Sequence, residues 1–83
     1  MNSIHQLEKG KTYRVKQEFR DYDNILHNPG KEWVFIETTF LPYHSGLSLF
    51  VMENGERKQY RFQQVPEEQE ALLANFMDYV ETL

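Results

Sequence analysis

The chain has 83 residues, of which 40% are hydrophobic and 14% aromatic, and it contains no cysteine. This length allows a single domain with one core, and the absence of cysteine excludes a disulfide framework and a cysteine-based zinc site. Nine basic and thirteen acidic residues give a net charge of −4, which argues against nucleic acid as a partner, because binding to nucleic acid depends on neutralising its phosphates. Residues 1–11 lack the apolar core of a signal peptide and no apolar stretch is long enough to span a membrane, so we expect a cytoplasmic protein without a membrane partner.

A first strand is predicted at residues 11–19, where apolar and polar side chains alternate with the period of a half-buried strand. Tyr13, Val15 and Phe19 share one parity, so we expect all three side chains to face the core. The polar residues 20–31 follow, and their Asp, Asn, Pro and Gly content predicts a long ordered loop.

A second strand is predicted at residues 32–40, which are rich in aromatic and β-branched side chains. Apolar residues of both parities occur at 33–36, which indicates that both faces of this strand are covered there. Pro42 and Gly46 then break the strand pattern and predict a turn around Tyr43–Ser45.

The third and fourth strands are predicted at residues 47–53 and 56–63, joined by Asn54-Gly55. This dipeptide is the strongest short signal for a two-residue type I′ turn, because both turn residues need a positive φ. Such a turn sets the register of the hairpin and predicts four pairs: Glu53 with Glu56, Val51 with Lys58, Leu49 with Tyr60, and Leu47 with Phe62. Paired residues lie on the same side of a sheet, so the apolar members of these pairs form one face.

The same register places Phe50 and Met52 on the opposite face of the hairpin, beside Arg57 and Arg61. Polar side chains are usual on the solvent side of a small sheet. Either another element covers this apolar pair, or it is an exposed patch of the kind that marks an interaction site.

A C-terminal amphipathic helix is predicted at residues 66–82, with Pro66 at its first position. Its apolar stripe consists of Leu72, Leu73, Phe76, Met77, Val80 and Leu83. The stripe must dock on one face of the sheet. We favour the face of Phe50 and Met52, which makes Phe50 a core residue. If the helix instead covers the face of Leu47 and Phe62, Phe50 is exposed and becomes the best interaction residue.

These elements predict a mainly β fold with one C-terminal α-helix. The long loop after the first strand favours a small Src-homology-3-like antiparallel barrel. The alternative is a bent meander of four or five strands with the helix laid across one face.

No catalytic, metal-binding or cofactor-binding residues are predicted. Asp21 and Asp23 fit positions 1 and 3 of a calcium loop, and Glu32 fits position 12. However, Ile25 and Leu26 occupy the positions that need an oxygen ligand and a sharply turning glycine. We therefore expect a loop whose Asp and Asn side chains bond their own backbone.

Four short motifs cover much of the chain: Tyr-x-Val at 13–15, Phe-x-Asp at 19–21, Gly-x-x-Trp-x-Phe at 30–35, and Phe-x-Pro-Tyr-x-x-Gly-Leu-x-Leu at 40–49. With them the chain resembles a family of small, mostly bacterial domains of unknown function. The resemblance implies a small domain and no particular activity, because no reaction is assigned to that family.

Three functions agree with the sequence. The first is a non-catalytic protein-interaction or regulatory module, a monomer or weak homodimer, whose candidate surface consists of Phe50, Met52, Arg57, Arg61, Pro42, Tyr43, His44 and Tyr22. The second is a small-molecule-binding or enzymatic role in the loops around Asp21–Asn24 and Tyr43–Ser45. The third is an acidic inhibitor or immunity-type protein that uses Glu67, Glu68 and Glu70 against a basic target.

Overall fold

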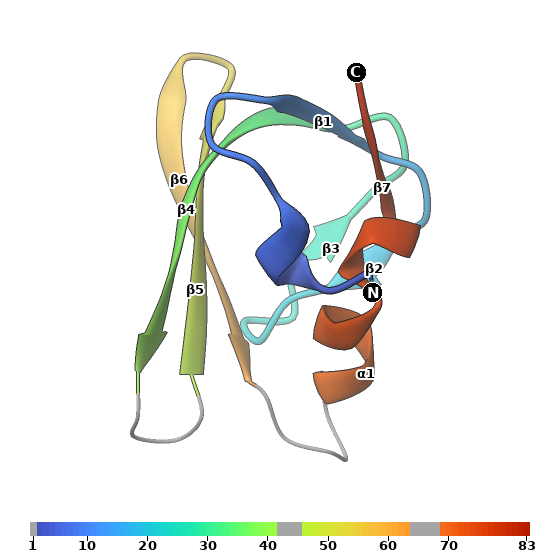
Figure 1. Cartoon of the computed structure of the whole chain (residues 1–83), viewed down its shortest axis with the longest axis vertical. Coiled ribbons are helices and arrows are strands. Elements are labelled where there is room, and N and C mark those ends of the chain that lie inside the picture. Colours follow the sequence, from blue (N-terminus) through green and yellow to red (C-terminus); the bar gives the residue numbers. More distant parts are fainter. Residues whose placement is uncertain (1, 42–45, 64–68) are drawn as a thin grey trace.

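A computed structural model describes residues 2–41, 46–63 and 69–83, which form a five-stranded antiparallel sheet, a small two-stranded sheet and little helix (Figure 1). The elements in chain order are the 3-10 helix η1 (Ile4–Gln6), β1 (Thr12–Val15), β2 (Phe19–Arg20), β3 (Leu26–His27), β4 (Glu32–Leu41), β5 (Gly46–Glu53), β6 (Glu56–Gln63), α1 (Glu70–Ala74), the 3-10 helix η3 (Phe76–Asp78) and β7 (Val80–Thr82).

The large sheet has the strand order β6-β5-β4-β1-β7, and β2 pairs with β3 in the small sheet. The predicted Src-homology-3-like barrel is wrong, since the described strands form no closed barrel. The reason is that β7 pairs with the free edge of β1, so the large sheet ends at β7 on one side and at β6 on the other. The bent, open sheet predicted as the alternative describes the fold better.

The hairpin of β5 and β6 has the predicted register, including the pairs Leu49 with Tyr60 and Leu47 with Phe62. Asn54 and Gly55 have φ values of 54° and 81°, as a type I′ turn requires. Turn chemistry and hydrophobic parity therefore determine this hairpin together.

Gly55→Ala tests the turn. We expect it to lower the free energy of unfolding by about 1–2 kcal/mol, because an L-residue is strained at this positive φ. Urea denaturation measures the change. The control is Asn54→Gly, which places a tolerant residue at the other positive φ and should not destabilise the protein. Equal losses in both variants would mean that turn strain is not the cause.

The strand predicted at 11–19 is in fact two strands, β1 and β2. Lys16 and Gln17 leave the sheet between them, and the backbone N–H groups of both donate to the Tyr79 carbonyl, at 2.8 and 3.2 Å. The segment predicted as a loop contains β3, so Phe19 pairs with His27 and the loop folds back as a hairpin. Two-residue strands are too short to show a period in the sequence.

The helix predicted at 66–82 is much shorter. Residues 66–68 lie outside the described residues, α1 ends at Ala74, and the last residues form β7. Val80 pairs with Val15, and the Leu83 N–H donates to the Thr12 carbonyl at 3.0 Å. Residues 80–82 therefore pair with the free edge of β1 instead of continuing the helix. The spacing of the apolar residues is compatible with a long helix and with the observed short helices and strand.

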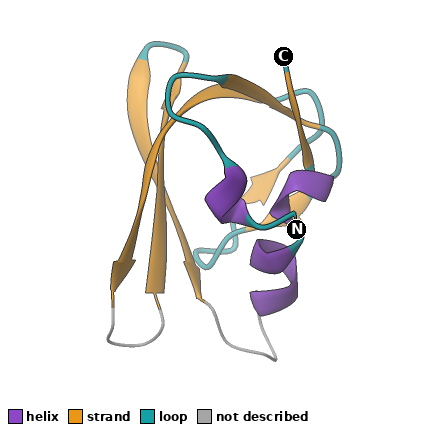
Figure 2. Cartoon of the chain, in the orientation of Figure 1, coloured by secondary structure: helices purple, strands orange, loops and turns teal. Residues whose placement is uncertain are grey.

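The core lies on the side of the sheet that carries Leu47, Leu49, Val51, Tyr60 and Phe62. The C-terminal segment packs on this side, where it contributes Leu73, Phe76 and Val80, each at most 1% exposed. Figure 2 shows the short helices together on one side of the long strands. The favoured expectation that the C-terminal segment covers Phe50 and Met52 is therefore wrong, because its apolar residues cover the opposite face.

Candidate functional site

The side of β4, β5 and β6 that faces away from the core is called the outer face here. Strand pairing arranges its residues in three rows: Val34, Met52 and Arg57; Glu37, Phe50 and Gln59; and Thr39, Ser48 and Arg61. A β-bulge between Phe35 and Glu37 shifts the register of β4 and places Glu37 opposite Phe50. Val34 and Glu37 were missed as surface partners because no sequence pattern reveals this bulge.

Phe50, Met52 and Arg57 come together on the outer face, as the hairpin register predicts. The Arg57 guanidinium carbon lies over the Phe50 ring, 4.8 Å from its centroid, and Arg57 Nη2 is 3.6 Å from Glu37 Oε2. Met52 is 38% exposed, whereas Phe50 is half-buried. The apolar patch is therefore smaller than expected, with Met52 as its most open residue and Arg57 stacked on Phe50.

Arg61 lies on the outer face but is held by the turn between β2 and β3. Its guanidinium binds both carboxylate oxygens of Asp23, with 3.1 Å between Arg61 Nε and Asp23 Oδ2. The Tyr22 N–H donates to the Arg61 carbonyl at 2.7 Å, and the Tyr22 ring is 52% exposed. The hydrogen bonds between the two side chains lower the pKa of Asp23 and raise the pKa of Arg61. Three other residues predicted for the surface lie outside the described part of the chain: Pro42, Tyr43 and His44.

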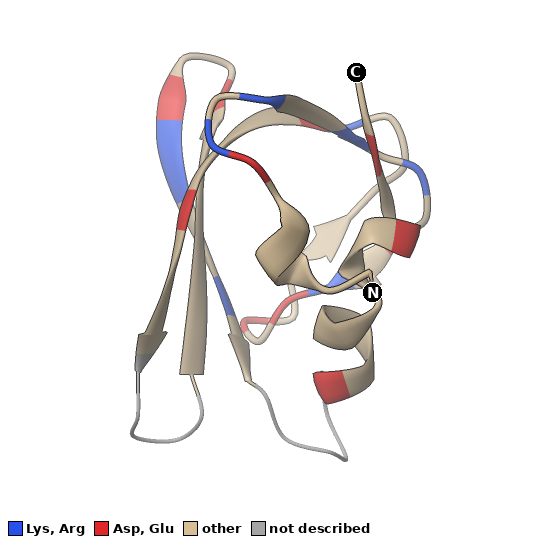
Figure 3. Ribbon diagram, viewed as in Figure 1, with Lys and Arg blue, Asp and Glu red and all other residues tan. Residues whose placement is uncertain are grey.

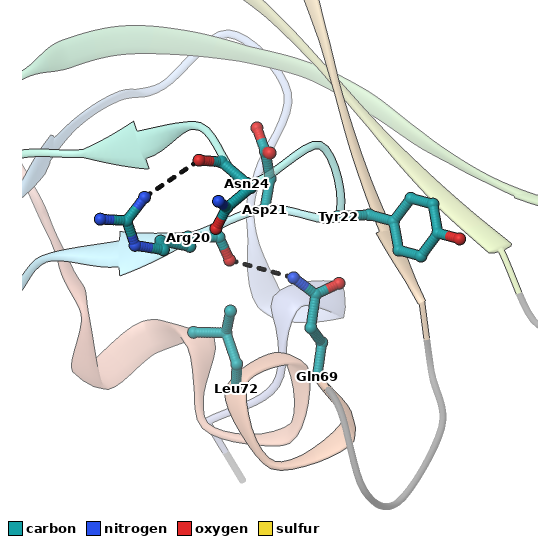
Figure 4. A pocket seen from close by; sticks show the side chains of 6 residues that line it. All are labelled: Arg20, Asp21, Tyr22, Asn24, Gln69 and Leu72. Carbon is teal, nitrogen blue, oxygen red and sulfur yellow. Dashed lines mark hydrogen bonds between the residues drawn. The ribbon is translucent and has the colours of Figure 1, made fainter.

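A pocket with a volume of about 480 Å³ lies where the turn between β2 and β3 approaches α1 (Figure 4). The residues that line it are Arg20, Asp21, Tyr22, Asn24, Gln69 and Leu72. Arg20 Nη1 donates to the Asn24 carbonyl, and Gln69 Nε2 donates to the Arg20 carbonyl, both at 3.0 Å. The pocket lies at the predicted Asp21–Asn24 loop and offers a ligand one guanidinium, from Arg20, and one aliphatic side chain, from Leu72.

The structure also contains a buried acid–histidine pair that sequence reasoning missed. Asp21 and His27 are 3% and 1% exposed, and Asp21 Oδ2 is 3.0 Å from His27 Nε2. Asp21 Oδ1 accepts a hydrogen bond from the Ile25 N–H at 3.0 Å, as expected of a loop aspartate that bonds its own backbone. The pair forms because β2 and β3 make a hairpin, and a segment read as a loop has no register from which to predict such a contact.

Asp21 and Asp23 thus have separate partners and do not form a common site. Within residues 2–41, 46–63 and 69–83, no group of three or more His, Asp or Glu side chains could hold a metal ion. Acidic and basic residues are interspersed along the sheet and the loops (Figure 3). In the same described ranges, no helix is long and apolar enough to cross a membrane.

No protein-family model matches the chain, and no functionally curated protein matches it. Among solved structures, integron cassette protein VCH_CASS4 from the mobile metagenome of Vibrio cholerae is 35% identical. The two structures superpose with a TM-score of 0.91 over 100% of this chain and 92% of that chain. That protein's name records its origin and no ligand or activity. The similarity agrees with the expected kinship to small bacterial domains of unknown function.

Proposed function

We propose that this chain, which belongs to the family of the Vibrio cholerae integron cassette protein, is a non-catalytic protein-interaction module whose docking surface is the outer face. One observation carries the proposal: the C-terminal segment packs on the opposite side of the sheet, so no described element covers Phe50 and Met52. An apolar patch rimmed by polar residues is typical of an interaction site.

The chemistry of the outer face indicates the kind of protein surface that fits it. Met52 and the half-buried Val34 and Phe50 provide an apolar centre, and Arg57 with Glu37 places both charges beside it. A partner therefore needs an apolar side chain that packs on Met52. It also needs polar groups that satisfy Arg57 and Glu37, because an unpaired charge buried in an interface opposes binding.

The test uses Met52→Glu, which adds a charge to the apolar centre without removing a core residue. Wild-type protein, Met52→Glu and the control Ile25→Glu serve as matched baits in bacterial lysate, since Ile25 is also exposed, at 49%, but lies outside the outer face. We expect the wild type and Ile25→Glu to retain the same partner, and Met52→Glu to bind it at least about tenfold more weakly, a loss of about 1.4 kcal/mol.

Two measurements complete this test. Equal urea midpoints of the three proteins show that the variants are folded, and sedimentation velocity shows whether the retained partner is a second copy of the chain. If Met52→Glu keeps full affinity for every protein that the wild type retains, the outer face is not the docking surface.

A second candidate function is small-molecule binding at the pocket between the β2–β3 turn and α1. Its volume of about 480 Å³ lies in the range of small-ligand sites. Arg20 favours a ligand with a carboxylate, and Leu72 favours one with an apolar body. Perturbation of NMR amide shifts around Asn24 by small aliphatic carboxylates tests this function. Loss of these shifts in Arg20→Met would place the ligand in the pocket, and no shifts with any such compound would exclude it.

The inhibitor hypothesis has less structural support. Glu70 is exposed at the start of α1, whereas Glu67 and Glu68 lie outside the described residues. A basic target therefore remains a hypothesis from the sequence alone.

A further inference from the structure

Five polar side chains connect the β2–β3 hairpin to the β5–β6 hairpin, and we call them the His27 network: Asp21, His27, Lys31, Glu53 and Tyr60. Asp21 Oδ2 is 3.0 Å from His27 Nε2, and His27 Nδ1 is 3.3 Å from Lys31 Nζ. Lys31 Nζ is 3.6 Å from Glu53 Oε1, which accepts a hydrogen bond from the Tyr60 hydroxyl at 2.5 Å. The network thus begins at the buried Asp21 carboxylate and ends at the Tyr60 hydroxyl. Lys31, in its middle, has a side chain that is 22% exposed.

The partners of His27 define its protonation state. A lysine ammonium can only donate, so His27 Nδ1 must accept from Lys31. The ring proton is then on Nε2, which donates to Asp21. This arrangement requires a neutral imidazole, because an imidazolium would carry a second N–H at Nδ1 that points at the Lys31 ammonium.

The surroundings of His27 also favour the neutral form. The Phe19 ring stacks on the imidazole with 4.7 Å between the centroids, and the Tyr60 ring meets it edge-on at 4.4 Å. Burial lowers the pKa of His27 and is the largest effect. The Lys31 ammonium lowers it further, while the Asp21 and Glu53 carboxylates oppose the shift. Burial also raises the pKa of the Tyr60 hydroxyl, so this group stays neutral.

The apolar anchor of the β2–β3 hairpin is Phe19, which lies in the core with its ring centroid 5.3 Å from that of Phe76 and 6.3 Å from that of Phe62. The hairpin's own sheet consists of two residue pairs, Phe19 with His27 and Arg20 with Leu26. Beyond the His27 network, polar contacts join the hairpin to β6 through the Tyr22–Arg61 backbone bond and the Asp23–Arg61 ion pair. Gln69 Nε2 also donates to the Arg20 carbonyl. A surface ion pair adds little to stability. The His27 network is therefore a buried polar link between this hairpin and the β5–β6 hairpin, in addition to the apolar anchor at Phe19.

We propose that the His27 network is a proton-sensitive clasp, which holds the turn of the β2–β3 hairpin, residues 21–25, against β5 and β6 when His27 is neutral and releases this turn when His27 is protonated. Protonation of His27 adds an N–H at Nδ1 that points at the Lys31 ammonium. Because both groups are cationic donors, either Lys31 must move away from His27 or the turn of the hairpin must open. The open form exposes His27 to water, where it binds a proton more readily. Acid thus favours opening: the clasp is closed above the ordinary histidine pKa of about 6.5 and opens as the pH falls below it.

NMR titration of the full chain from pH 8 to pH 5 tests the clasp. The ring signals of His27 follow its protonation. We expect His27 to titrate below the ordinary histidine pKa of about 6.5. In hydrogen exchange corrected for its intrinsic pH dependence, the Tyr22 and Ile25 amides should lose protection by up to about tenfold per pH unit, as the uptake of one proton requires. The Leu49 and Val51 amides of β5 should keep theirs.

Two lysine variants separate the clasp from a purely structural histidine. Lys31→Met removes the opposing ammonium, so the His27 titration should move to higher pH, and the acid-induced loss of protection at the Tyr22 and Ile25 amides should become smaller. Lys58→Met removes a surface lysine outside the network and should change neither. The proposal is overturned if His27 titrates at or above the ordinary histidine pKa of about 6.5, if the Tyr22 and Ile25 amides keep their protection down to pH 5, or if Lys31→Met changes neither the His27 titration nor the loss of protection.

Discussion

Replacing Phe76 with alanine should lower the free energy of unfolding by about 3–5 kcal/mol, a loss comparable to the whole stability of many small domains. Phe76 is 0% exposed, and its ring lies 5.3 Å from Phe19, 6.1 Å from Phe62 and 6.5 Å from Trp33 between centroids. These partners come from β2, β6 and β4, so the cavity left by the ring cannot be closed by the shift of one element. Urea denaturation followed by tryptophan fluorescence measures the loss.

The matched control is Phe40→Ala. Phe40 is another phenylalanine, near the end of β4 on the core side of the sheet, but it is 55% exposed. We expect this variant to lower the free energy of unfolding by less than about 1 kcal/mol, because folding removes little of the apolar surface of Phe40 from water. If the two substitutions were equally costly, the C-terminal segment would not close the core as described.

The parts of the fold that could be predicted are those where two local signals agree. Asn54-Gly55 determines a turn, and the alternation in the strands on both sides points to the same register, so β5 and β6 were predicted to within a residue. The β4 strand was predicted almost as well, because its composition is rich in aromatic and β-branched residues.

The parts that could not be predicted depend on tertiary pairing. The helical spacing correctly predicted the burial of Leu73, Phe76 and Val80, whereas Leu83 of the same predicted stripe is 54% exposed. The same spacing also fits a short helix, a 3-10 turn and a strand. The choice between them depends on the free edge of β1, which pairs with Val80–Thr82 and which no local pattern shows.

The candidate site follows the same division. Phe50, Met52 and Arg57 share a face because of the hairpin register alone, so their proximity could be predicted. Glu37 joins them through the bulge in β4. The contact of His27 with Asp21 requires the β2–β3 hairpin, whose two-residue strands are below the length at which alternation can be recognised.

Asp21→Ala should lower the free energy of unfolding by about 2–5 kcal/mol at pH 7. The reason is that it leaves the buried His27 Nε2–H and the part-buried Ile25 N–H without an acceptor, and an unsatisfied buried donor costs about 1–3 kcal/mol. Asp21→Asn retains one carbonyl oxygen and should recover part of the loss. Thermal and urea unfolding of the variants beside the wild type measure these differences.

Asp23→Ala is the control for Asp21→Ala, because it removes the same side chain two positions along the same turn. The ion pair of Asp23 with Arg61 lies at the surface rather than in the core, so removing the Asp23 side chain should barely change the unfolding midpoint. Similar midpoints for the two alanine variants would show that the Asp21–His27 contact adds no more stability than a surface ion pair. A large loss confined to Asp21→Ala would mean that this small domain depends on a buried polar contact as well as on its aromatic core.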